Sequence, residues 1–159
     1  MEKKSLILNF KNNTLSKLKL DIDVLNEDFF ENTRLLGITA HLKNYQFCWQ
    51  LNSLYGFDFR LNPEIEIHLK KKERNYYFNI YQSQEPNSSL LHTLYHNQFD
   101  GEYLLPEFKH MDFLWLMKGG FVEEERFNWI KQAVKTINGI QLVIELTNDQ
   151  IKTKENMVF

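Results

Sequence analysis

The chain has a single cysteine, Cys48, among its 159 residues, and it has no long apolar run. One cysteine excludes an internal disulfide and suits a reducing compartment, so we expect a cytoplasmic protein. The longest apolar stretch near the N-terminus, Leu6-Ile7-Leu8, is shorter than the apolar region of about 7–15 residues in a secretory signal. No stretch approaches the ~20 residues that cross a bilayer. The sequence therefore predicts neither export nor membrane insertion.

An excess of basic charge is also absent. The net charge is -2, from 19 basic and 21 acidic residues, and both signs are scattered along the chain. Nucleic acid is therefore not the expected partner, because a phosphate backbone requires a basic stripe. The clear excess is aromatic, at 14% of the residues. Aromatic side chains favour strands and bury large areas, which indicates a Phe-rich core, and the alternative is that some tyrosines form a contact surface.

Alternation of apolar and polar residues predicts the strands. The alternation is strict over residues 17–24, and further strands are expected at 34–40, 64–69, 76–82, 92–98, 111–118 and 141–146. The polar run 70–75 is expected to turn the chain into a hairpin. The segment 111–118 is the most apolar, so we expect it to be a central strand covered on both faces.

Two helices interrupt this pattern. The first begins after Asn44 as a possible cap and ends at Gly56, and its apolar stripe predicts a well-buried helix built on Tyr45, Cys48, Trp49, Asn52, Leu51, Leu54 and Tyr55. The second runs from about Glu123 to Ile137, with glutamates in its first turn and lysines later, as the helix dipole favours. The order of elements predicts a single α+β domain, a mainly antiparallel sheet with two amphipathic helices packed on one side.

The expected domain covers residues 15–150, with 1–14 as an N-terminal extension and 151–159 as a C-terminal segment. His92 and His96 have the spacing H-x-x-x-H, which on a helix would suit a zinc site. On the expected strand their rings lie roughly 13 Å apart, so we expect solvent-facing histidines and predict no metal and no cofactor.

The segment from Leu105 to Phe113 carries the most informative pattern. A rigid Pro106-Glu107 pair precedes an apolar run that contains one acid, Asp112. A carboxylate at the mouth of a buried strand must bind backbone N–H groups or a cation, so we expect Asp112 to cap a neighbouring turn. Glu107 suits either a partner contact or a solvated loop.

This segment resembles the motif of the bacterial IPExxxVDY family. Pro106, Glu107 and Asp112 match that motif outright, and Phe113 replaces its tyrosine, which removes a phenol. The likeness extends from Leu18 onward through Lys19-Leu20-Asp21, Gly37-Ile38, Trp49-Gln50-Leu51-Asn52 and Lys154-Glu155-Asn156-Met157-Val158-Phe159. The family brings no assigned activity, and the resemblance implies that the C-terminal segment docks on the domain.

These observations favour a non-catalytic module that binds another protein, and homo-oligomers through an exposed edge strand are a further option. The candidate binding residues are Pro106, Glu107, His110, Asp112, Tyr77 and Tyr81. One alternative is a small enzyme that uses Glu107, His110 and Asp112, which requires these side chains to converge in a cleft. Another is a single-stranded RNA platform formed by Lys70-Lys71-Lys72, Arg74 and nearby tyrosines.

Overall fold

The computed structural model describes residues 28–158, so the strand expected at 17–24 lies outside the described residues. The elements follow the order β1 (Arg34–Ala40), α2 (Asn44–Tyr55), β2 (Arg60–Lys71), β3 (Arg74–Gln84), β4 (Leu91–His96), β5 (Gln98–Phe99), β6 (Glu102–Tyr103), η1 (Pro106–Phe108), β7 (Phe113–Lys118), α3 (Glu124–Lys135), β8 (Ile140–Leu146), η2 (Asn148–Gln150) and η3 (Lys154–Met157). The η elements are short 3-10 helices.

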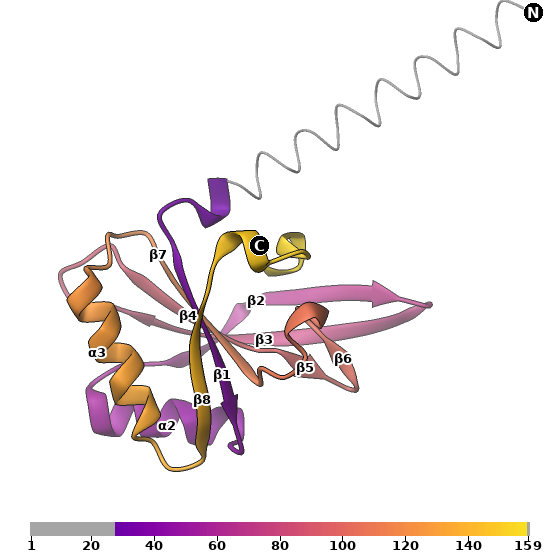
Figure 1. The fold of residues 1–159 in the computed structure, drawn as a ribbon. Helices are drawn as coiled ribbons and strands as arrows, with labels where there is room; N and C mark the ends of the chain where they lie inside the picture. Colours follow the sequence, from indigo (N-terminus) through magenta and orange to yellow (C-terminus); the bar gives the residue numbers. More distant parts are fainter. Residues whose placement is uncertain (1–27, 159) are drawn as a thin grey trace, which may run out of the picture.

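Six strands form one antiparallel sheet in the order β2-β3-β4-β7-β1-β8, and β5 and β6 form a small separate hairpin. α2 and α3 lie on the same side of the large sheet, as Figure 1 shows. The predicted α+β class, with two helices on one side of a mainly antiparallel sheet, is confirmed. The most apolar strand, β7, lies inside the sheet between β4 and β1, as its sequence predicts.

The sheet has a hydrophobic core on each face. On the helix face, Phe113, Trp115 and Met117 of β7 pack with the buried stripes of α2 and α3. On the opposite face, Leu114 and Leu116 of β7 pack in a core that includes the loop before β7 and the segment after β8. Loops and short 3-10 helices close this second core, so its stability depends on how those loops are held.

The β2–β3 hairpin is longer than expected. Only Lys72 and Glu73 form its turn, with φ angles of 48° and 62°, and the strands continue on both sides. Two successive residues with positive φ are typical of a two-residue turn of the primed type, whose twist matches the flanking strands. The prediction of a turn over 70–75 is wrong because Lys70 pairs with Asn75 and Lys71 with Arg74, so the polar residues on both sides of the turn belong to the strands. All six side chains are exposed at the hairpin tip, which is why a polar run there does not mark the length of the turn.

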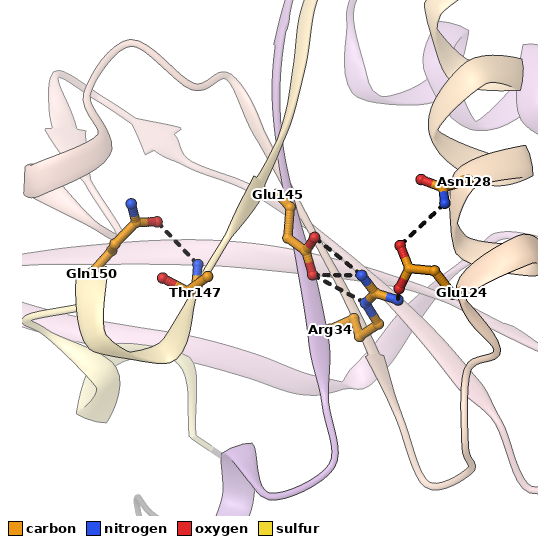
Figure 2. A network of polar contacts seen from close by, with 6 residues as sticks. All are labelled: Arg34, Glu124, Asn128, Glu145, Thr147 and Gln150. Atoms are coloured by element: carbon orange, nitrogen blue, oxygen red, sulfur yellow. Dashed lines mark hydrogen bonds and ion pairs between the residues drawn. The ribbon is translucent and has the colours of Figure 1, made fainter.

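Arg34 ties the N-terminal end of α3 to the edge of the sheet (Figure 2). Its Nη1 donates to Glu124 Oε2 at 2.6 Å, and its Nε and Nη2 donate to Glu145 Oε1 at 3.0 and 2.9 Å. The guanidinium also lies 3.5 Å above the ring centre of Phe127. Since Arg34 belongs to β1, Glu145 to β8, and Glu124 and Phe127 to α3, this single side chain links three elements.

Candidate functional site

The Leu105–Phe113 motif is held in place by Asn97, a fully buried residue that follows β4. Asn97 Nδ2 donates to the carbonyl oxygens of Phe108 and Met111, both at 2.9 Å, and Asn97 Oδ1 accepts from the Leu105 N–H at 2.8 Å. Its backbone N–H donates to the carbonyl of Asp112. One amide side chain therefore satisfies three buried backbone groups of a loop that has little regular structure.

Glu107 binds the C-terminal segment. Its Oε1 accepts from the backbone N–H groups of Lys152 and Thr153 at 2.6 and 2.9 Å, and its Oε2 contacts Thr153 Oγ1 at 2.9 Å. Burial alone would raise the pKa of Glu107, but these hydrogen bonds to the ionised form outweigh it and lower the pKa. The carboxylate is neither simply solvated nor left open to a partner, and it acts as an anchor within the domain.

Residues on both sides of that anchor pack into the core. Ile151 and Met157 are buried on the sheet face opposite the helices. Tyr95 Oη donates to the Met157 carbonyl at 3.3 Å, and Asn156 Nδ2 donates to the Leu104 carbonyl at 2.7 Å. The segment 151–157 thus lies against the same loop that carries the motif.

Asp112 binds the end of β1. Its Oδ2 accepts from the Ala40 N–H at 2.8 Å, and its backbone N–H donates to the Ile38 carbonyl at 2.8 Å. The pairing of β1 with β8 shifts register between Thr39 and Ala40, which frees this N–H for the carboxylate. The expectation that a backbone N–H satisfies Asp112 is confirmed, although the partner is the end of a strand and not a turn.

The three residues of the enzyme hypothesis do not converge. Glu107 faces Lys152 and Thr153 while Asp112 faces Ala40, so their carboxylates are bound to different segments. His110 is exposed, and its carbonyl accepts from the Thr39 hydroxyl. None of the three lines the cavities described below. Within the described residues, the arrangement braces the fold and does not bring these three side chains together for acid–base chemistry.

The two candidate tyrosines have different surroundings. Tyr77 is 40% exposed, and its ring stacks on that of His68 with 4.9 Å between centroids. Tyr81 is half-buried against the helix-side core. Burial, followed by the nearby Cys48, raises the pKa of Tyr81, and a hydrogen bond to Asn44 acts in the opposite direction. Of the two, only Tyr77 is exposed.

The basic cluster at the hairpin tip is partly neutralised. Lys71 Nζ pairs with Glu102 Oε1 at 2.8 Å, and Arg74 Nη2 pairs with Asp100 Oδ2 at 2.9 Å. Both acids come from the small β5–β6 hairpin, which the sequence patterns did not reveal. Two of the four cations required by the RNA hypothesis are thus occupied by protein carboxylates.

The outer face of α2 is the feature that the sequence assigned wrongly. Its sheet-facing stripe is Phe47, Cys48 and Leu51, while Tyr45 and Trp49 are 61% and 67% exposed. Aromatic and aliphatic residues occur on more than one face of this helix, so the periodic pattern did not determine which face is buried. Burial raises the pKa of the Cys48 thiol to about 12, which leaves the thiol protonated and unreactive.

A shallow groove follows the exposed face of α2. Its volume is about 570 Å³, and its lining residues are Leu42, Tyr45, Gln46, Trp49 and Gln50. The 12 residues of α2 include no charged side chain, whereas charged residues make up 25% of the chain. We call this groove and its lining the α2 face.

A second, polar pocket lies where the α2–β2 connection, the β3–β4 loop and the first turn of α3 meet. Its volume is about 90 Å³, and its lining includes Tyr55, Asp58, Ser83, Glu85, His92 and Arg126. We call it the His92 pocket. Figure 1 shows that β4, which carries His92, lies in the interior of the sheet beneath the two helices.

His92 was expected to face solvent, and this prediction is wrong because Phe57, Phe59 and Trp115 pack around its ring and bury it completely. Trp115 Nε1 donates to His92 Nδ1 at 3.1 Å. Burial lowers the pKa of His92 to about 4, although the carboxylate of Glu85 acts to raise it. The imidazole is therefore neutral at physiological pH.

Within residues 28–158, no three side chains of histidine, cysteine, aspartate or glutamate are grouped as a metal site would require. None of the described helices combines the length and apolar character of a membrane-spanning segment. Comparison with protein-family models, curated proteins and solved structures found no match to this chain. Its resemblance to the IPExxxVDY family stays a prediction.

Proposed function

We propose that this protein is a non-catalytic module that binds another protein through the α2 face. The observation that carries the proposal is an uncharged helix that exposes Tyr45 and Trp49 one turn apart, beside an apolar groove. Aromatic residues are enriched at the centres of protein interfaces and charged residues are depleted there. Tryptophan and tyrosine are also the residue types that most often dominate binding energy.

The composition of the α2 face restricts the partner. A charged partner surface would lose its hydration against this face without gaining an ion pair, because α2 supplies no charge. The Gln46 and Gln50 amides can accept and donate at the rim. We infer that the partner presents an uncharged apolar stripe, such as one face of an amphipathic helix, with polar groups at its margins.

The motif region supports this proposal indirectly. Glu107 and Asp112 hold the loop and the end of β1, so their carboxylates are structural in the free domain. Pro106, His110 and Tyr77 are exposed and stay candidates for additional contacts. A cytoplasmic location is part of the proposal, and it is supported by a buried, unpaired Cys48, which suits a reducing compartment.

A site-specific photo-crosslink tests the proposal. A benzophenone amino acid is placed at position 49, and at position 121 as a control, since Phe121 is 85% exposed and does not line the α2 groove. A protein that crosslinks to position 49 but not to position 121 is identified and purified. Its binding affinity is then measured for the wild type and for Trp49→Ala. We expect Trp49→Ala to weaken binding by about 30-fold, the loss typical of a central tryptophan.

The matched control is Phe121→Ala, which should leave the affinity unchanged. Both variants remove an exposed ring, so the unfolding midpoint should stay within the range of ordinary surface substitutions. Equal affinity for wild type and Trp49→Ala would overturn the proposal. A homodimer in light scattering that Trp49→Ala dissociates would also overturn it, because the occupant of the α2 face would then be a second copy.

A further inference from the structure

The His92 pocket has an unsatisfied hydrogen-bond donor in its wall. The indole N–H of Trp115 can only donate, so His92 Nδ1, which accepts it, carries no proton. A neutral imidazole then carries its proton on Nε2. Nε2 is buried and has no hydrogen-bond partner among the described residues. A buried N–H without an acceptor is unfavourable, so this position favours a ligand that supplies one.

An acceptor of protein origin lies beside this donor but is too distant to satisfy it. Glu85 Oε2 is 3.7 Å from His92 Nε2, beyond hydrogen-bond range. Arg126 Nη2 donates to the other oxygen, Glu85 Oε1, at 3.0 Å and holds the carboxylate in this position. The pocket thus presents one N–H donor and one carboxylate acceptor side by side, with their heavy atoms 3.7 Å apart.

A primary amide is complementary to this pair. Its oxygen and nitrogen share one carbon and lie about 2.2 Å apart from standard bond lengths, so each can reach its own partner. The oxygen accepts from His92 Nε2–H and the nitrogen donates to Glu85 Oε2. A carboxylate ligand would meet the charge of Glu85, and an ammonium ligand would leave Nε2–H unpaired. A metal ion requires the Nε2 lone pair, which the proton occupies.

We propose that the His92 pocket binds a small neutral molecule through a primary carboxamide group, held between His92 Nε2 and Glu85 Oε2. The cavity of about 90 Å³ has room for a group of this size, and the exposed Pro86 is one of its lining residues, so a larger ligand can extend beyond it to the surface. The α2 face lies elsewhere on the domain, so this proposal is independent of the protein-binding function.

Nuclear magnetic resonance of the full chain tests this site with acetamide as the probe. The chain has three tryptophans, and Trp49→Phe and Trp129→Phe assign the Trp115 indole signal by elimination. Because Trp115 Nε1 donates to the ring that binds the amide, its signal should shift saturably as acetamide is added. Acetate and methylammonium, which carry only half of the complementary pair, should give no saturable shift.

Substitution of Glu85 provides the second measurement. Glu85→Ala removes the acceptor and should weaken acetamide binding about tenfold, the loss typical of a hydrogen bond to a charged group. Glu125→Ala is the matched control, because it removes the same charge beside Arg126 from an exposed residue that does not line the pocket. Signals elsewhere in the spectrum report whether each variant is folded.

Each of the following results would overturn the proposal. The first is no saturable shift of the Trp115 indole with acetamide. The second is an equal response to acetamide and acetate, which would indicate a general solvent effect. The third is equal weakening by Glu85→Ala and Glu125→Ala, or a crystal structure in acetamide in which only a water molecule lies against His92 Nε2.

Discussion

Replacing Asn97 with alanine should destabilise the domain more than its single amide suggests. The substitution leaves the Leu105 N–H and the Met111 carbonyl without their partner, in a site where Asn97 itself is fully buried. The Phe108 carbonyl loses one of its two bonds and keeps the one from the Met111 N–H. Each of the two groups left unpaired costs about 1–3 kcal/mol, and the lost bond to the Phe108 carbonyl adds about 0.5–1.5 kcal/mol. We therefore expect a loss of about 4 kcal/mol, a large fraction of a typical domain stability of about 5–15 kcal/mol.

Urea unfolding followed by circular dichroism measures this loss directly. For a chain of this size the same loss lowers the melting temperature by roughly 8–16 °C. Gln98→Ala is the matched control, since Gln98 is the exposed neighbour and its amide makes one long contact of 3.4 Å to Tyr103. Its change should stay within about 0.5 kcal/mol. An Asn97→Ala variant less than about 1 kcal/mol below the wild type would refute the reasoning.

Asn97→Asp separates the roles of donor and acceptor. Aspartate keeps the acceptor for the Leu105 N–H but directs an oxygen at the Phe108 and Met111 carbonyls, so burial should raise its pKa in the folded state. A raised folded pKa contributes stability below the unfolded value of about 3.9, and this stability is lost as the pH rises through the folded pKa. The deficit relative to wild type should therefore be smaller at about pH 4 than at about pH 7, and an equal deficit at both would contradict this account.

Three further predictions concern other parts of the fold. Glu107→Ala should increase hydrogen exchange in residues 151–157 while β7 stays protected. In the wild type the pKa of Glu107 is lowered in the folded state, so the stability that this anchor contributes is lost as the pH falls through the folded pKa. His92 has a folded pKa of about 4, below its unfolded value, so the unfolded state binds the proton first and stability should fall by about 3 kcal/mol between about pH 6.5 and 4. Urea unfolding over this range tests it, and His92→Gln should flatten the profile. Arg34→Lys loses the bidentate contact with Glu145, so the free energy of unfolding measured in urea should fall by about 1 kcal/mol. No change in that free energy would mean that the fork geometry of the guanidinium is unimportant.

Much of the fold could be predicted from local pattern alone. The alternation over 64–69 of β2 and the apolar run of β7 predicted two strands of the sheet, and Gly56, with a φ of 72°, ends α2 as expected. These features depend on neighbouring residues and on the period of one element. The backbone contact of the half-buried acid Asp112 was predictable as well, because a carboxylate at the start of an apolar strand requires polar partners whatever the fold.

The candidate sites depended on contacts that no local pattern encodes. Asn97 resembles any polar residue at the end of a strand until the chain brings residues 105–111 around it. His92 and Thr93 are consecutive polar residues, which suits an exposed strand, and only the packing of Phe57 and Trp115 shows that His92 is buried. On α2 the excess of apolar residues left two possible faces, and the sheet selected Phe47 over Tyr45 and Trp49.

The position of Ile151 and Met157 has a consequence for how the protein is made. Both side chains complete the core on the sheet face opposite the helices, and that core also contains residues from β3, β4 and β7. Both residues follow β8, so they emerge from the ribosome after all six strands of the large sheet. The strands synthesised earlier therefore wait with one apolar face uncovered, and this interval is when the nascent protein most needs a chaperone.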